Sequence, residues 1–248
     1  AVNYDDYPVS TVYINKIEAA GIKIENTLKW FNSVSAYLSE KQIELLKSYS
    51  FIEKIEPVRS LKSKHPYKTY LSKSGETSDI NYGPSFAQNN LSEIPVLHKH
   101  GINGKGIIVG LLDTGFRWDA SDVYDSLIVI DEYDFVNNDS ITKNQSGDPA
   151  GQDFHGSAVL SIAAGYKSGI LIGPAYKASF LLAKTENTLT ERNVEEDNYA
   201  AALEWMEAKG ADLASSSLGY SEFDPGETSY TYEDMDGKTA ICTKAAEI

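Results

Sequence analysis

The chain has 248 residues, and its 22 lysines and arginines face 36 aspartates and glutamates, which gives a formal net charge of −14 at pH 7. Nucleic acids are bound through clustered basic side chains, and anionic membranes repel an acidic surface, so this charge argues against both partners. No apolar run approaches the roughly 18 residues that a membrane-spanning helix needs. The single cysteine, Cys242, excludes an intrachain disulfide and is expected to be a buried small side chain.

Residues 1–61 form one small unit by their hydrophobic pattern. The pattern predicts a helix over 8–20, a strand over 22–25, an alternating strand over 28–38, a helix that begins at the capping box Ser39-Glu-Lys-Gln42, and a final strand over 51–58. This order is that of a ferredoxin-like α+β plait without its first strand. Taken alone, the stretch fits a generic small binding module equally well.

Residues 62–86 are polar, nearly without periodicity, and contain both Pro and Gly. These features are typical of a linker, and exposed linkers are where proteolytic nicking concentrates. The remaining residues, 87–248, are treated as one further domain.

A short apolar run over 107–112 stops at Asp113, and Thr114-Gly115 then turns the chain sharply. Such a run, without polar alternation, is typical of a central strand in a parallel sheet. Ligands and chemistry gather at the carboxyl ends of these strands. Further along, His155 opens a helix of small residues in His155-Gly-Ser-Ala-Val159. Either feature alone is more often structural, but the two together are much more specific.

The later elements predict a doubly wound α/β fold. Weak alternation over 127–136 indicates a strand, the apolar run 178–183 a second, and the stretch 211–219 a third. A helix over 194–209 lies between the last two; its inner side is expected to carry Val194, Tyr199, Leu203 and Met206. Strand, helix and strand in succession favour a parallel sheet. A last helix is predicted over 237–248.

With these motifs, the chain resembles the subtilisin-like serine proteases. Asp113-Thr-Gly is similar to the aspartate motif of that family, His155-Gly-Ser-Ala-Val to its histidine motif, and the order Asp before His agrees with a triad order of Asp, His, Ser. The resemblance implies a subtilisin-like parallel doubly wound sheet in 87–248. It also implies that 1–61 are a propeptide, a chaperone and inhibitor of the enzyme, and that maturation cuts within 62–86.

The resemblance assigns roles to five residues. Asp113 would orient His155, and His155 would act as the general base. Ser217, Leu218 and Gly219 would line the pocket for the substrate residue before the scissile bond. The chemistry requires no cofactor. The family often holds structural calcium, but the acidic stretch after Asp113 lacks EF-hand spacing and fits a solvated loop as well, so the metal ligands stay unknown.

The nucleophile of the family, in Gly-Thr-Ser-Met-Ala-x-Pro, has no counterpart here, and Gly226-Glu-Thr-Ser229 lies in a polar loop without a following helix of small residues. We therefore expect the catalytic serine to lie outside this chain, in a C-terminal remainder of the peptidase domain, and the chain alone to be inactive. The parent would be a secreted serine endopeptidase in zymogen form that acts on polypeptides. The alternatives are a catalytically inactive subtilase-like interaction module and, less well supported because no Walker loop is present, a nucleotide binder.

Overall fold

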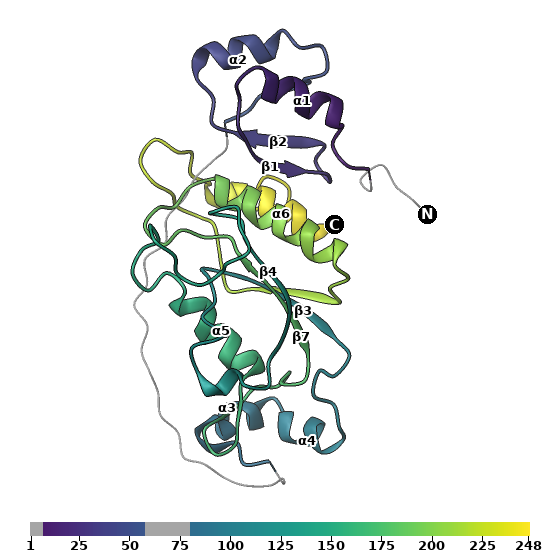
Figure 1. The fold of residues 1–248 in the computed structure, drawn as a ribbon, viewed down its shortest axis with the longest axis vertical. Helices are drawn as coiled ribbons and strands as arrows, with labels where there is room; N and C mark the ends of the chain where they lie inside the picture. Colours follow the sequence, from purple (N-terminus) through teal and green to yellow (C-terminus); the bar gives the residue numbers. More distant parts are fainter. Residues whose placement is uncertain (1–6, 58–79) are drawn as a thin grey trace. The chain divides into compact units, whose positions relative to one another are not determined.

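The structure is a computed structural model that describes residues 7–57 and 80–248 (Figure 1). The chain divides into two compact units. One unit comprises 1–63 together with 190–205 and 220–248, and the other comprises 64–189 together with 206–219. Most of the predicted linker, residues 62–79, lies outside the described residues.

The second unit contains a four-stranded parallel sheet, which confirms the predicted α/β class. Its strand order is β4 (Ile128–Asp134), β7 (Ser179–Lys184), β3 (Ile108–Asp113) and β8 (Leu213–Ser216). In the register, Asp113 and Asp134 both pair with Lys184, so three charged residues lie at one level at the carboxyl ends of the strands. An antiparallel two-stranded hairpin, β5 (Tyr166–Lys167) with β6 (Leu171–Ile172), was not predicted.

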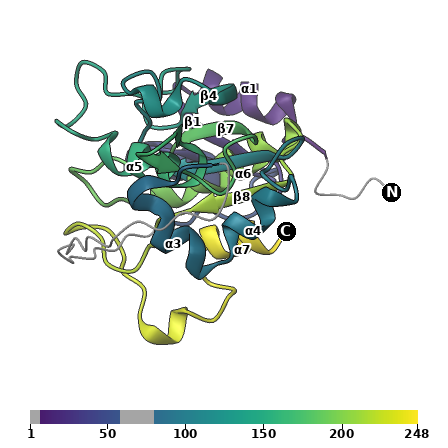
Figure 2. The same ribbon diagram turned by 90° about the horizontal axis from the view of Figure 1, so that it is seen from below.

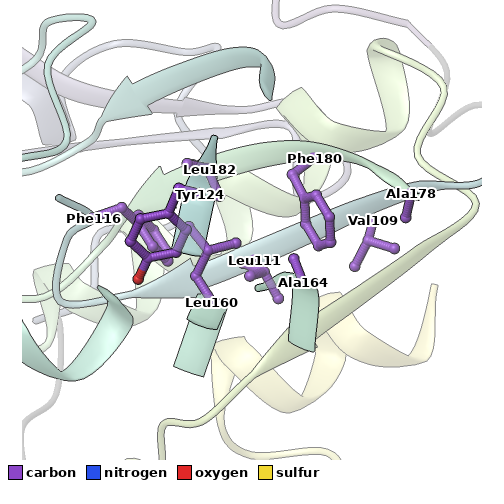
Figure 3. Packing of buried hydrophobic residues seen from close by; sticks show 9 residues of the cluster. All are labelled: Val109, Leu111, Phe116, Tyr124, Leu160, Ala164, Ala178, Phe180 and Leu182. Atoms are coloured by element: carbon purple, nitrogen blue, oxygen red, sulfur yellow. The ribbon is translucent and has the colours of Figure 1, made fainter. Parts of the chain in front are cut away.

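Helix α5 (Phe154–Ala164) packs on one face of this sheet. Figure 3 shows Leu160 and Ala164 of the helix against side chains of β3 and β7, all of which are buried. The cluster comprises Val109, Leu111, Phe116, Tyr124, Leu160, Ala164, Ala178, Phe180 and Leu182. Gly110 lies between Val109 and Leu111 and therefore faces the other side, where a Cβ would come within 2.2 Å of the Met206 sulfur. Both faces of β3 are thus covered, as its apolar sequence predicts.

The chain before the sheet forms short helical segments that lie close together (Figure 2). They are η2 (Gly83–Ser85), α3 (Phe86–Leu91) and α4 (Ile94–Lys99), and a further 3-10 turn, η3 (Asp122–Tyr124), follows β3. Tyr82 is buried against Ile172 and Tyr176. His98 of α4 is buried, and both of its ring nitrogens form hydrogen bonds. Nδ1 bonds the Tyr82 hydroxyl at 2.5 Å, and Nε2 bonds the Pro174 carbonyl at 2.9 Å. These contacts attach residues 80–99 to the second unit.

The first unit begins with helix α1 (Thr11–Ala19), the antiparallel hairpin β1 (Ile24–Leu28) and β2 (Ser33–Ala36), and helix α2 (Glu40–Lys47). The capping box that starts α2 is confirmed, with reciprocal bonds between Ser39 and Gln42. The single strand predicted over 28–38 is wrong. Those residues form the end of β1, a turn and β2, and Asn32 takes a left-handed φ of 44° in the turn.

The final strand predicted over 51–58 is also wrong for its described part, 51–57, which forms no strand. Its apolar side chains are used differently. Phe51 stacks on Tyr13 of α1 with ring centroids 4.3 Å apart, and Ile52 and Ile55 pack on the cluster around Ile17. The apolar side chains of this stretch therefore pack against a helix and do not belong to a strand paired with a neighbour.

The first unit also contains most of helix α6 (Val194–Ala208), the 3-10 turn η4 (Tyr232–Asp234) and helix α7 (Ile241–Glu247). Leu28 of β1, Ala200 of α6 and Ala245 of α7 share one buried cluster. Of the inner side predicted for α6, Met206 is buried, whereas Val194, Tyr199 and Leu203 are half-buried. Ala200, Ala202 and Glu204 are buried as well. A prediction of a single apolar face therefore underestimates how much of this helix is buried.

Candidate active site

The carboxylate of Asp113 and the imidazole of His155 form a direct hydrogen bond. Asp113 is the last residue of β3 and His155 the second residue of α5. Their Oδ1 and Nδ1 atoms are 2.7 Å apart; the Asp113 side chain is 1% exposed and that of His155 is 35% exposed. The same Oδ1 accepts the Thr114 N–H at 2.7 Å. Because an ionised carboxylate only accepts, Nδ1 of His155 carries the proton, and the lone pair of the neutral ring resides on Nε2.

Glycine at position 156 permits this close approach of strand and helix. A Cβ there would lie 2.2 Å from the Gly115 carbonyl oxygen, a backbone atom that could give way only if the turn shifted, and 3.0 Å from the Asp113 Cβ. The Gly156 N–H also donates to the Thr114 hydroxyl at 3.3 Å. The Gly that follows His155 in the motif therefore sets the spacing between the two elements that carry Asp113 and His155.

Side chains around the start of α5 fix its first turn. The Ser157 hydroxyl donates to the Asp153 carbonyl at 2.5 Å and accepts the Arg117 N–H at 2.7 Å. The buried Asp153 carboxylate pairs with the Arg117 guanidinium at 3.0 Å and accepts the Asn144 N–H at 2.9 Å. The turn that follows Asp113 and the helix that carries His155 are thus held together by polar contacts on both sides.

A buried ion triad lies beside this pair at the end of the sheet, and it was missed by the sequence reasoning. Lys184 Nζ is 2.7 Å from Asp134 Oδ2 and 2.8 Å from Asp148 Oδ2, and the Lys184 side chain is 1% exposed. Burial raises the pKa of the Asp134 carboxyl, while the bond to Lys184 opposes that rise. A lysine directly after the apolar run 178–183 was the signal that could have found it, because a buried cation needs a partner.

The proposed substrate-pocket residues Ser217, Leu218 and Gly219 follow β8 directly. Ser216 of β8 pairs in parallel with Leu112 of β3. Ser217 therefore follows at the carboxyl end of the sheet, one residue beyond this pair. A Cβ placed at Gly219 would meet no atom within 4 Å. Space beside this backbone is therefore open at the position where the resemblance places a substrate.

Two of the acidic residues after Asp113 form ion pairs with lysines. Lys143 pairs with Asp119, and Lys209 pairs with Asp131 at 2.7 Å. The side-chain hydrogen bond from the lysine is the main reason why the pKa of each carboxyl is lowered. Within 7–57 and 80–248, no group of three or more His, Cys, Asp or Glu side chains is arranged to hold a metal ion. The residues described here therefore do not fit a carboxylate calcium cage. Over the same ranges, every helix is too short or too polar to cross a bilayer.

Comparison with known proteins gives two family matches and several relatives. Residues 104–245 match the model of the subtilase family, and residues 1–73 match that of a peptidase S8 propeptide domain of Bacteroidota. The minor extracellular protease Vpr of Bacillus subtilis (strain 168) is 28% identical over 182 residues, which are 70% of this chain and 22% of Vpr. The chain thus spans about a fifth of that relative's length.

Solved structures show the same fold. Fervidolysin from Fervidobacterium pennivorans, a keratinolytic enzyme related to subtilisin, aligns with a TM-score of 0.53 at 20% identity, over 88% of this chain and 36% of its own. The epidermin leader peptide processing serine protease of Staphylococcus aureus aligns with a TM-score of 0.58 at 12% identity, over 85% and 49%. Together with the motifs and the family matches, they lead to one conclusion: the chain belongs to the subtilase family and carries a peptidase S8 propeptide domain before its subtilase domain.

Proposed function

We propose that this chain is the N-terminal part of a secreted serine endopeptidase in zymogen form, in which Asp113 and His155 are two members of an Asp-His-Ser triad. The observation that carries the proposal is the 2.7 Å bond from His155 Nδ1 to a carboxylate that is 1% exposed. This bond fixes the tautomer that a general base of this type requires. The name of Vpr, a minor extracellular protease, supports the extracellular location.

The proposed chemistry follows from the fixed tautomer. Nε2 of His155 takes the proton of a serine hydroxyl as the serine attacks the scissile carbonyl, and later returns it to the leaving amine. Asp113 stays ionised and stabilises the imidazolium that forms between these steps. The serine is supplied by sequence outside residues 1–248, since the chain has no Gly-Thr-Ser motif. Ser217, Leu218 and Gly219 line the pocket, where the open space beside Gly219 admits the backbone of an extended peptide.

Residues 1–61 are proposed to be the inhibitory propeptide, 62–86 the linker that is cut on maturation, and 87–248 the first part of the peptidase domain. The contacts within the first unit support the inhibitor role. The buried Glu204 carboxylate of α6 accepts the backbone N–H groups of Lys29, at 2.9 Å, and Trp30, at 3.1 Å. The Asn26 amide donates to Asn198 at 2.9 Å. The β1–β2 hairpin therefore binds a helix of the subtilase domain by charge-assisted and apolar contacts.

The test uses the full-length protein that contains residues 1–248. A phosphonylating reagent specific for activated serines should label one serine, and the matured protein should hydrolyse unfolded polypeptides. Asp113→Asn should lower kcat by about 10⁴-fold, because an amide can hold the ring in the wrong tautomer. Asp125→Asn, at an exposed carboxylate of the same unit, should leave kcat unchanged. Absence of both labelling and hydrolysis in the parent protein would favour the inactive interaction module.

The inhibitor role is tested separately. Glu204→Ala removes the acceptor of the Lys29 and Trp30 N–H groups, so cleaved propeptide should dissociate sooner and activity should appear earlier after maturation begins. Glu207→Ala, at an exposed position of the same helix, serves as the control. An unchanged lag in the Glu204 variant would contradict an inhibitory role for this contact.

A further inference from the structure

Gln152, three residues before His155, uses its whole side-chain amide in hydrogen bonds. Nε2 donates to the Thr114 carbonyl at 2.8 Å and to the Glu186 carbonyl at 2.5 Å. Oε1 accepts from the Thr188 N–H at 2.8 Å and from the Thr188 hydroxyl at 2.9 Å. A primary amide has two donor hydrogens and two acceptor lone pairs, so all of its capacity is engaged.

The orientation of this amide is determined by its partners. Two carbonyl oxygens face one side and can only accept, while the Thr188 N–H on the other side can only donate. A flipped amide would place its oxygen against both carbonyls. Gln152 is 1% exposed, so a lost bond there would leave a buried polar group unsatisfied. The residue is therefore held in one rotamer and one orientation.

The bonds of Gln152 join three segments that meet at the Asp113–His155 pair. Thr114 follows Asp113, and its hydroxyl also accepts the Gly156 N–H at the start of α5. The loop after β7 holds Asp113 from the other side, because the Thr185 N–H donates to the Asp113 carbonyl at 3.1 Å. Gln152 itself leads into α5. A closed set of hydrogen bonds thus runs from the turn after β3 to the loop after β7 and to the start of the His155 helix.

We propose that Gln152 is a positioning residue for the catalytic pair; this proposal rests on the proposed peptidase function. It keeps the turn after Asp113, the loop at Glu186 and Thr188, and the start of α5 at fixed separations. Its saturated, buried amide has no group left for a substrate, so it acts only through Asp113 and His155. An error of about 1 Å in such a constellation can cost a factor of about 10² in rate.

The first test needs no protease activity. A proton held between an imidazole nitrogen and a carboxylate resonates far downfield, and the chain has 4 histidines, so the His155 Nδ1–H signal can be assigned at low temperature with a His155→Gln variant. Gln152→Met preserves the length of the side chain and removes its hydrogen bonds, and it should abolish the signal or broaden it by exchange with water. Gln152→Glu preserves the shape and loses one or both donors, and it should weaken the signal.

Gln145→Met is the matched control. Gln145 lies in the loop before α5, and its amide donates to both Asp139 carboxylate oxygens and to the Ile141 carbonyl at 3.1 to 3.2 Å, but none of these partners adjoins Asp113 or His155. This variant should retain the downfield signal even where it lowers the melting temperature. A folded Gln152→Met or Gln152→Glu variant whose signal matches the parent in position and exchange rate would overturn the proposal.

The second test uses the full-length protein. Gln152→Met should lower kcat by about 10- to 100-fold and change KM by no more than about threefold, because alignment of the pair is lost while the substrate pocket remains. Gln145→Met should leave both constants unchanged. If the parent hydrolyses nothing but its downfield signal still depends on Gln152, the peptidase function fails and the positioning role stands. If the parent is active and the Gln152 variants retain its kcat, the positioning role fails alone.

Discussion

Replacing Asp197 with Asn should make the first unit more stable at neutral pH. Asp197 lies in the first turn of α6 and is 5% exposed. Burial raises its pKa from 3.8 to about 7; the nearby Ser35 hydroxyl of β2 lowers it and the charge of Glu196 raises it further. The positive end of the helix would favour the ionised form, but the loss of water outweighs it.

The sign and size of the effect follow from this pKa. Between about pH 4 and about pH 7, the unfolded chain has lost the Asp197 proton while the folded chain retains it, so the free energy of unfolding falls as the pH rises. Above about pH 7 both states are ionised and the contribution is constant. One pKa unit corresponds to about 1.4 kcal/mol, so the rise from 3.8 to about 7 destabilises the folded state by up to about 4 kcal/mol at alkaline pH.

Urea unfolding from about pH 4 to about pH 8 measures this difference. A Trp118→Phe background removes the tryptophan of the second unit, so that Trp30 and Trp205 report on the first. Asp197→Asn should match its background near pH 4 and exceed it by up to about 4 kcal/mol above pH 7. Glu233→Gln, at an exposed carboxylate of the first unit, should show no such divergence. A difference that does not change with pH would refute the reasoning.

Two further substitutions test the second unit. Lys184→Met leaves Asp134 and Asp148 buried without their cation, so it should lower the free energy of unfolding by about 3–5 kcal/mol in urea titrations. Replacing both aspartates with Asn in the same variant should restore most of this stability. Gly156→Ala places a methyl group against the Gly115 carbonyl, so it should cost about 1–3 kcal/mol and abolish the downfield histidine proton signal in NMR spectra. A Lys184→Met protein as stable as the parent, or a Gly156→Ala protein with an intact signal, would contradict these accounts.

The local pattern predicted the elements that carry the candidate pair. The run 107–112 contains no polar residue, which indicates a strand covered on both faces, and β3 ends at Asp113 as expected. The His155 motif predicted the start of α5 within one residue. Parallel strands and a helix between them then bring the two side chains to one edge of the sheet. Their catalytic roles remain predictions.

Where one pattern has two physical origins, the sequence prediction failed. The apolar residues in 51–57 predict a strand, but they pack on α1 and the cluster around Ile17. The stretch 28–38 alternates across a turn, and only the left-handed Asn32 separates two strands there. Periodicity records which side chains are buried and does not record what covers them.

The sequence by itself determined the fold class, the family and the Asp113–His155 pair, because each depends on short motifs whose residues adjoin the element they specify. The tertiary structure alone decided which polar groups are buried. Asp197 in an acidic first turn reads as solvated, but Ser35, far from it in the chain, lies against it. Gln152 and Lys184 are buried in the same way, against carbonyls and carboxylates that come from separate parts of the chain. Burial depends on partners distant in sequence, and one chain read alone does not show them.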